Sequence, residues 1–262
     1  MFVLILSGPV TGKRADSQAW SQMEARRPGP TQKSDVPATT RERDTRKSGT
    51  PSRPDTRATP TPARRDARAD ADLCAACRAG KLAEVKRILD TGRADVNCRS
   101  VVGMTPVMRA AGWGHRDVVE LLVSRGADVS LVDDDGDNVL HYACEGGYRK
   151  TVEFVLSLDG VDINSRGQRS MTPVMLAALR GHRDVVEFLV SRGADVSLVD
   201  GVGNDILHYA CRGGDRKTVE FVLSLDGVDI NVRNDYGETA ADVARDGRHH
   251  QLSDLLVSRG TQ

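Results

Sequence analysis

The stretch Met104-Thr105-Pro106-Val107-Met108 recurs without change as Met171-Thr172-Pro173-Val174-Met175, 67 positions later. A second stretch, Leu140-His141-Tyr142-Ala143-Cys144, recurs at the same distance as Leu207-His208-Tyr209-Ala210-Cys211. Self-similarity at a fixed period is the sequence signature of repeat architectures, in which each unit buries its apolar face against the next. The chain is therefore predicted to contain an array of stacked units.

Each 67-residue block divides into two shorter units. One equivalent position recurs at spacings of 33, 34, 33 and 34 residues, and it is occupied by Thr105, Asn138, Thr172, Asp205 and Thr239. Thr, Asn and Asp are favoured helix N-caps, and proline is tolerated at the first helical position, where its missing N–H leaves no bond unmade. Each of these positions is therefore predicted to begin a helix.

The rest of a unit predicts a second helix and a hairpin. Gly114 ends the first, inner helix, and an outer helix is predicted from 117 to about 124, with Leu122 on its apolar face. Gly126 stops the outer helix, and an extended hairpin leads into the next unit. No unit could bury its apolar face alone, so stacking must make the core continuous.

These motifs resemble those of the ankyrin-repeat family. The match is carried by residues 103–106, by Gly114-His115 and by residues 121–128, and the resemblance covers about residues 72–260. It implies an all-α solenoid of stacked helix–turn–helix units with β-hairpin loops. It also implies a protein-binding surface formed by the hairpin tips and the concave inner-helix face, without naming the partner.

Two regions are expected. Residues 1–70 carry 14 basic and 8 acidic side chains, whereas residues 71–262 carry 23 and 29, so a basic segment precedes an acidic one. Residues 1–69 have too few apolar side chains to offset the entropy of ordering, which predicts a disordered Arg/Thr/Pro-rich arm. The repeat domain is predicted at 70–262, with units at about 70–99, 100–132, 133–166, 167–199, 200–233 and 234–262.

The cysteines and the N-terminus suggest the compartment. Five cysteines are an odd number scattered through helix-like segments, which argues against a disulfide framework and predicts a reducing compartment, the cytoplasm or the nucleus. The apolar run 2–6 lacks a basic segment before it and is followed by Gly8-Pro9, so no signal peptide is predicted. A membrane span needs about 20 apolar residues, and the sequence contains no such run.

The two blocks differ where the resemblance places a partner. Segments 115–166 and 182–233 differ at nine of 52 positions, of which three lie at the hairpin tip and one on the inner-helix face, and the stretches before them differ at further tip and inner-helix positions. Either exposed positions have drifted, or each tip binds a different patch of the partner, and the second interpretation is preferred. The predicted partner-binding residues are Val101, Val102, Met104, Trp113, Asp134, Asp135, Asp137, Glu145, Arg169, Met171, Arg180, Val202, Asn204, Arg212, Asp235 and Tyr236.

Two groups in this set are distinctive. Trp113 lies between two glycines and is the candidate anchor, because tryptophan is enriched at interface hot spots; the alternative is that it packs sideways on a neighbouring helix. The second group is acidic in one block and not in the other: Asp134, Asp135, Asp137 and Glu145 become Gly201, Val202, Asn204 and Arg212. Tyr142 and Tyr209 could either face the concave binding surface or pack between neighbouring helices.

No catalytic, metal or cofactor site is expected. Cys74 and Cys77 form half of a possible zinc site, but a structural zinc needs about four ligands and no second pair exists. Cys77, Cys144 and Cys211 are instead predicted to be small buried side chains. Residues 133–137 resemble part of a calcium loop, but position 142, where that loop needs a glutamate, is a tyrosine.

The sequence therefore predicts a non-catalytic protein-interaction module or adaptor, a monomeric array that needs no cofactor. Two alternatives stay open. The basic arm could tether the chain to nucleic acid or to an anionic membrane surface, which would show a steep salt dependence. The chain could also be a fragment of a larger ankyrin-containing signalling protein.

Overall fold

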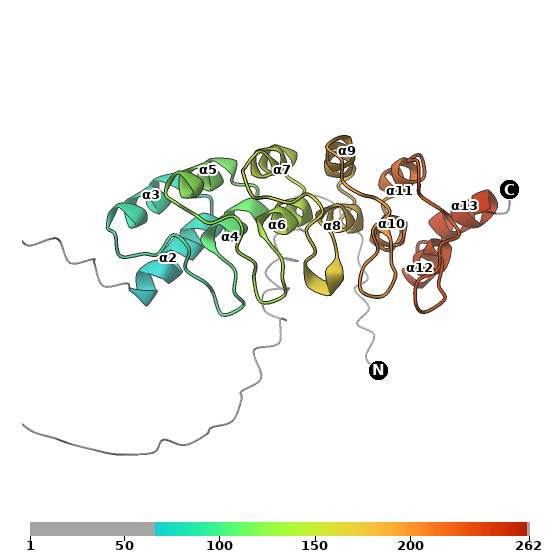
Figure 1. The fold of residues 1–262 in the computed structure, drawn as a ribbon, viewed down its shortest axis with the longest axis horizontal. Helices are drawn as coiled ribbons and strands as arrows, with labels where there is room; N and C mark the ends of the chain where they lie inside the picture. The colour runs from blue at the N-terminus through green and yellow to red at the C-terminus, as the bar shows by residue number, and fades with distance from the viewer. Residues whose placement is uncertain (1–65, 261–262) are drawn as a thin grey trace, which may run out of the picture. The chain divides into compact units, whose positions relative to one another are not determined.

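A computed structural model describes residues 66–260 of the chain (Figure 1). Most of the predicted basic arm, residues 1–65, lies outside these described residues. Within them the helices are α2 (Ala67–Arg78), α3 (Leu82–Asp90), α4 (Pro106–Gly112), α5 (Arg116–Ser124), α6 (Val139–Gly146), α7 (Arg149–Leu156), the short 3-10 helix η1 (Gln168–Ser170), α8 (Pro173–Leu179), α9 (Arg183–Ser191), α10 (Ile206–Gly213), α11 (Arg216–Val222), α12 (Ala240–Asp246) and α13 (His250–Gly260).

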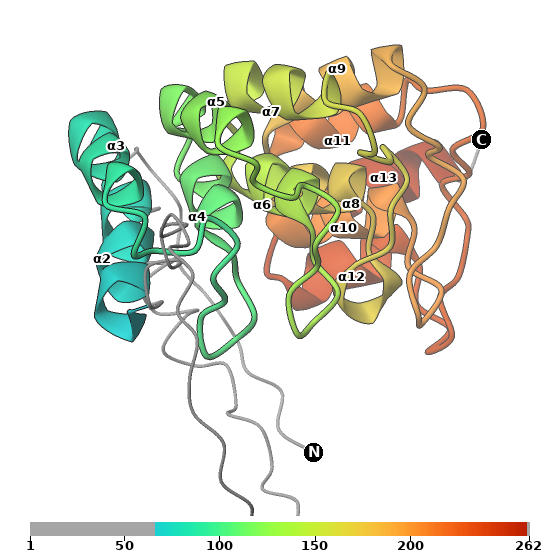
Figure 2. The same cartoon turned by 60° about the vertical axis from the view of Figure 1, so that its left-hand side comes forward.

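The helices form two rows. Figures 1 and 2 show an inner row of α2, α4, α6, α8, α10 and α12 beside an outer row of α3, α5, α7, α9, α11 and α13, with loops projecting from the inner row. Residues 66–260 contain no regular β-strand, and one isolated antiparallel bridge joins Arg233 to Thr239. The all-α repeat architecture is therefore confirmed, whereas the loops predicted as β-hairpins are closed by turn hydrogen bonds instead of strand ladders.

The inner helices begin at the predicted caps. The side chain of Asn138 accepts hydrogen bonds from the backbone N–H groups of Leu140 and His141, 3.0 and 3.1 Å away. Thr239 and Asp242 cap each other reciprocally, and such capping satisfies N–H groups that have no partner inside the helix. The fold therefore begins its helices where short polar side chains were found at the repeat spacing.

The first helix starts earlier than predicted. Asp66 accepts a hydrogen bond from the N–H of Arg68 at 3.0 Å and caps α2, which begins at Ala67. Residues 67–69 were assigned to the arm because apolar side chains are sparse there and show no period. Alanine and arginine have high helix propensity, and an acidic cap is sufficient to extend the helix into this stretch.

The core consists of small and branched apolar side chains shared between units. Leu122, Leu140 and Ala111 are fully buried, and Cys144 and Cys211 are buried at the positions that alanine occupies in the neighbouring units. Burial raises the pKa of Cys211 to about 12, which keeps it a neutral thiol. The prediction that these cysteines are buried packing residues is confirmed.

Charged side chains connect the outer helices. Arg116, Arg149 and Arg183 each lie over the ring of a phenylalanine on the next outer helix, with guanidinium-to-centroid distances of 5.5, 5.4 and 5.8 Å. Each arginine also pairs with the glutamate four residues later on its own helix. Exposed contacts of these kinds add little to the free energy of unfolding, so they supplement the core rather than replace it. Among residues 66–260, no helix has the length and apolar character needed to cross a membrane.

Candidate protein-interaction surface

Five turns project from the inner row, and we call them fingers. In each finger the N–H of the first residue donates to the carbonyl of the fifth, at 2.9 to 3.0 Å, and this bond fixes the width of the loop. Because the same bond recurs in all five fingers, they present their tips at equivalent positions along the stack. The fingers are residues 100–104, 133–137, 167–171, 200–204 and 234–238.

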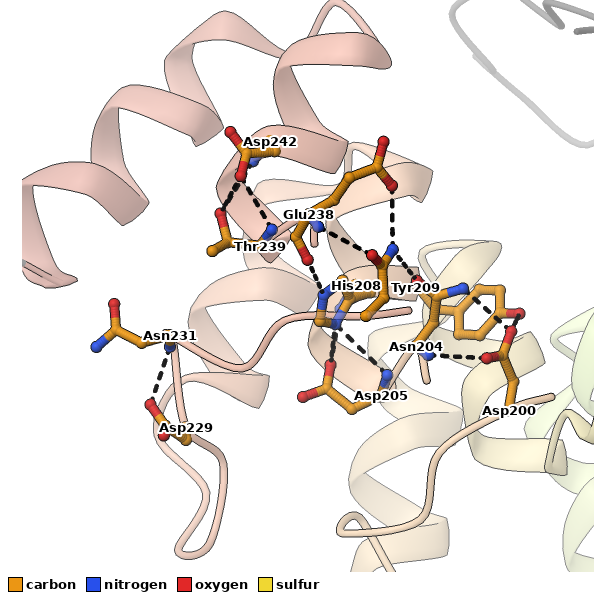
Figure 3. Close-up of polar contacts among 11 residues, drawn as sticks. Asp200, Asn204, Asp205, His208, Tyr209, Asp229, Asn231, Glu238, Thr239 and Asp242 are labelled. Carbon is orange, nitrogen blue, oxygen red and sulfur yellow. Dashed lines mark hydrogen bonds and ion pairs between the residues drawn. The ribbon is translucent and has the colours of Figure 1, made fainter. Parts of the chain in front are cut away.

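In two of the fingers, a buried aspartate at the base accepts hydrogen bonds that hold the turn. Asp200 accepts hydrogen bonds from the backbone N–H of Asn204 at 2.8 Å and from the hydroxyl of Tyr209 at 2.6 Å (Figure 3). It also accepts one from the backbone N–H of Val202 at 2.9 Å. Burial alone would raise the pKa of Asp200, but these donors hold it below its usual value. Asp133 and Tyr142 repeat the arrangement one block earlier.

These bonds settle the position of the two tyrosines. Tyr142 and Tyr209 are buried, with 1% and 3% of their surface exposed. Their rings pack among the helices, and their hydroxyls donate to the carboxylates at the finger bases. Of the two orientations that the sequence left open, packing is therefore the observed one.

Neighbouring fingers are bonded to each other. The backbone N–H of Asp134 donates a hydrogen bond to the carbonyl of Val102 at 3.3 Å. In the same way, the N–H of Gly201 donates to the carbonyl of Arg169 at 2.7 Å, and the N–H of Asp235 donates to the carbonyl of Val202 at 3.0 Å. Each of these bonds joins consecutive fingers about 32 residues apart in the chain. Their tips therefore form one surface rather than separate loops.

The structure exposes much of the predicted partner-binding set. Val101 and Tyr236 are the most exposed large apolar side chains among the described residues, at 88% and 72%. The other exposed or half-buried members are Val102, Trp113, Asp134, Asp135, Arg169, Arg180, Val202, Arg212 and Asp235. Whether these residues contact a partner stays a prediction.

Met104 and Met171 are not at the surface. They are buried, with 2% and 7% exposed, although both were predicted among the surface residues of the tips. Each is the last residue of a finger and immediately precedes the helix cap, and Met171 packs with Leu176 and Tyr209. An apolar side chain just before an N-cap commonly packs against the first turns of the helix, which explains the burial.

Asp137 and Asn204 are also buried, at 7% and 3% exposed. Asp137 accepts a hydrogen bond from the N–H of Gln168 at 2.9 Å, and Asn204 accepts one from the side chain of Asn234 at 2.9 Å. Both side chains therefore join their finger to the next. Expecting them at a partner surface was wrong, because their polar groups are used between units.

The predicted acidic cluster also loses Glu145 from the surface. Glu145 is only 8% exposed and forms an ion pair with Arg180 of the following unit. Two members of the predicted surface therefore neutralise each other. Only Asp134 and Asp135 keep acidic groups accessible on this finger, and Asp134 lies 3.7 Å from the guanidinium of Arg99.

Trp113 is half-buried beside the first unit. The guanidinium of Arg78, at the end of α2, lies 5.1 Å from the centre of its ring. A groove of about 470 Å³ runs beside this part of the inner row and is lined by Ala71, Cys74, Arg78, Cys98, Val101 and Arg109. Sequence reasoning missed most of these residues, because they come from α2, α4 and the first finger and share no motif.

Two buried histidines occupy equivalent positions in the two blocks. The Nδ1 atom of His141 lies 2.8 Å from the side-chain oxygen of Asn138, and burial lowers the pKa of His141 to about 4. In His208, Nδ1 lies 2.7 Å from the carboxylate of Asp205 and Nε2 lies 3.2 Å from the carbonyl oxygen of Glu238 (Figure 3). Burial also acts to lower the pKa of His208, but Asp205 outweighs it and the net shift is upward.

Residues 66–260 contain no group of three or more side chains placed so that they could hold a metal ion. They do form paired helices, capped at a spacing of 33 or 34 residues, with fingers that are linked to one another between consecutive inner helices. The sequence profile described as "Ankyrin repeats (3 copies)" matches residues 73–167, 126–200, 158–234 and 174–262. The chain belongs to the ankyrin-repeat family.

Three relatives show how this ankyrin-repeat chain compares with known proteins. Ankyrin repeat domain-containing protein 63 of Homo sapiens is 37% identical over 120 residues, which are 44% of this chain and 31% of the relative. The probable palmitoyltransferase AKR2 of Saccharomyces uvarum is 36% identical over 210 residues, 65% of this chain and 28% of the relative. The nuclear factor NF-kappa-B p105 subunit of Rattus norvegicus is 33% identical over 153 residues, 56% and 16% respectively.

The chain spans less than a third of each relative's length, and only 5% of the ankyrin repeat and KH domain-containing protein CBG24701 of Caenorhabditis briggsae. The similarity is therefore one of shared repeats. Ankyrin repeats are generally protein-interaction modules.

Proposed function

We propose that this ankyrin array is a non-catalytic adaptor that binds a partner protein through its finger tips and inner-helix face. Val101 on the first finger and Tyr236 on the last carry the proposal, because both are large apolar side chains left mostly exposed. Tyrosine is enriched at interface hot spots, and an aliphatic side chain such as that of Val101 can serve as an anchor that enters a pocket of the partner. Bonds between fingers supply the rigid support.

The remaining exposed residues make this surface chemically mixed. Asp134 and Asp235 are acidic, whereas Arg169 and Arg212 are basic, and all four are exposed. A polar rim around apolar anchors is the usual organisation of an interface. The palmitoyltransferase named among the relatives does not argue for catalysis here, because the match covers 28% of that protein.

Replacing the two apolar tips is expected to weaken binding strongly. The double variant Val101→Ser, Tyr236→Ala removes two hot-spot candidates, and each costs about 1–2 kcal/mol, so the Kd should rise at least tenfold. The partner is captured from a lysate with the full chain, identified by mass spectrometry, and its affinity measured by calorimetry.

Val257→Ser is the matched control, because Val257 is 54% exposed but lies on α13, away from the fingers. Its Kd should equal that of the unaltered chain. Equal affinity of the double variant and the control would overturn the proposal. Arg180 is unsuitable for this test, since removing it leaves the carboxylate of Glu145 buried without its ion pair, which destabilises the fold itself.

The duplicated blocks allow a further arm of the same experiment. Exchanging Asp134→Gly and Asp135→Val gives the second finger the tip residues of the fourth. If each tip binds its own patch of the partner, the exchange changes the Kd severalfold. An unchanged Kd would instead support drift of exposed positions.

A further inference from the structure

The thiols of Cys74 and Cys98 face each other at the N-terminal end of the stack. Cys74 lies on α2 and Cys98 lies in the segment that leads into the first finger, 24 residues later, with their Sγ atoms 3.8 Å apart. Both cysteines are free thiols. A disulfide has an S–S distance of about 2.05 Å, so the sulfur atoms need to approach by less than about 2 Å. Side-chain rotation moves sulfur atoms on this scale.

The partner of Cys74 is therefore not the cysteine nearest to it in sequence. Cys77 also lies on α2, but its side chain is fully buried in the core, and burial raises its pKa to about 12. Cys74 is half-buried and lines the groove described above together with Cys98. The groove gives a small oxidant a path to this pair that Cys77 lacks.

Electrostatics favour Cys74 as the nucleophile of the pair. The hydrogen bond between the two thiols lowers the pKa of Cys74; burial and Asp70 act in the opposite direction, and the positive charge of Arg109 adds to the lowering. The pKa of Cys98 is raised, so Cys98 keeps its proton. The thiolate is the reactive form of cysteine, and a low-pKa cysteine beside a second thiol is the usual arrangement of an oxidation-sensitive pair.

We propose that Cys74 and Cys98 are a site of reversible oxidation, at which hydrogen peroxide produces an intramolecular disulfide. The Cys74 thiolate attacks one peroxide oxygen, the O–O bond breaks, and hydroxide leaves, so that Cys74 becomes a sulfenic acid. The hydroxide takes the proton of Cys98, whose sulfur then attacks the Cys74 sulfur; the S–O bond breaks and the released hydroxide takes up a proton. Two thiols lose two electrons, and one peroxide becomes two waters.

The disulfide would connect α2 to the start of the first finger. Within residues 66–260 the first unit packs against a neighbouring unit on one side only, so an added restraint should matter most there. Cys98 is followed by Arg99, which donates a hydrogen bond to the carbonyl of Val132 at 2.7 Å and lies 3.7 Å from the carboxylate of Asp134 on the second finger. Oxidation therefore restrains the end of the stack that also carries Val101, and a dithiol reductant reverses it.

Peptide mapping of the full chain tests the site without any partner. The reduced protein is treated with hydrogen peroxide, remaining thiols are blocked with N-ethylmaleimide, and trypsin is used without reductant. Trypsin places Cys74 and Cys77 together in peptide 69–78 and Cys98 in peptide 94–99. The expected product is these two peptides joined, with a mass two hydrogens below their sum plus one N-ethylmaleimide on the remaining thiol of Cys77, and separable by dithiothreitol. A bond inside peptide 69–78 would instead pair Cys74 with Cys77 and would overturn the proposal.

Serine variants identify the sulfur atoms. Cys77→Ser should keep the joined peptides at the yield of the unaltered chain, whereas Cys74→Ser and Cys98→Ser should abolish them. Cys98→Ser should also accumulate a Cys74 sulfenic acid that dimedone traps. Far-UV circular dichroism checks that each variant is folded, and Cys98→Ala replaces Cys98→Ser if it is not. Oxidation of buried Cys144 and Cys211 at the same rate as the pair would count against a specific site.

Discussion

An alanine at position 146 is expected to destabilise the protein by about 2–3 kcal/mol, although alanine normally favours a helix over glycine. Gly146 is the last residue of α6, and a Cβ atom added there would lie 2.3 Å from the carbonyl oxygen of Gly112 at the end of α4. Backbone is in the way, so neither helix can accept the methyl group without shifting. Gly213 and Leu179 repeat this contact at 2.2 Å between α10 and α8.

Urea unfolding followed by circular dichroism measures the effect. The midpoint of Gly146→Ala should fall, and that of Gly213→Ala should fall by a similar amount. Gly92→Ala is the control, because nothing lies within 4 Å of its added Cβ and its φ of +65° leaves only the cost of a left-handed backbone, about 1 kcal/mol. A midpoint for Gly146→Ala at or above that of the unaltered chain would show that the inner helices do not approach this closely.

Acidification is expected to remove on the order of 3 kcal/mol of stability through His141 alone. Its pKa is lowered by burial to about 4 in the folded chain, compared with about 6.5 in the unfolded one. The unfolded state therefore binds a proton more readily, and stability is lost as the pH falls from about 6.5 towards 4. Below pH 4 the folded state is protonated as well, and this contribution stops growing.

His208 is expected to behave in the opposite way. Its pKa is raised in the folded state, because Asp205 outweighs the effect of burial. Protonated His208 therefore stabilises the fold below about pH 6.5, and this stabilisation is lost as the pH rises through the raised pKa. The two histidines occupy equivalent positions, but they change the stability of the fold with pH in opposite directions. The difference arises from the helix cap beside each ring, which is Asn138 for His141 and Asp205 for His208.

Exchanging the two caps tests this directly. At pH 5, neutral His141 costs about 2 kcal/mol, and Asn138→Asp should remove most of that cost by placing a carboxylate beside the ring. Asp205→Asn should lower the pKa of His208 and make the protein more sensitive to acid. NMR titration of the two imidazoles, with urea unfolding at pH 7 and pH 5, gives both quantities. Identical titration curves for His141 and His208 in the unaltered chain would refute the account.

The sequence by itself determined the architecture, because repetition, helix capping and apolar periodicity are all local properties. Asn138 and Asp205 cap helices in the structure as their spacing predicts, and the exposed tips at Val101 and Tyr236 follow from their place between helix stops and helix starts. Cys144 and Cys211 were assigned to the core because they replace an alanine in the repeat. Each of these predictions needs only one unit and the rule that units stack.

Tertiary structure decided which polar side chains remain at the surface. Asp137, Asn204 and Glu145 look like exposed residues within their own unit, but each finds its partner in the next unit, 30 to 35 residues away. The pairing of Asp133 with Tyr142 shows the signal that sequence reasoning could have used, since the same two residue types recur nine positions apart as Asp200 and Tyr209.

The relation of Cys74 to Cys98 was likewise beyond the sequence. The sequence indicated Cys77 as the neighbour of Cys74, because it lies three residues away on the same helix. The fold instead brings the Sγ atom of Cys98, 24 residues away, to within 3.8 Å of that of Cys74. Contacts between units depend on side-chain direction and on how closely helices approach, as at Gly146, and a repeat pattern specifies neither. The local pattern of residues therefore determined how each unit is built, and packing between units decided which side chains remain accessible for binding or reaction.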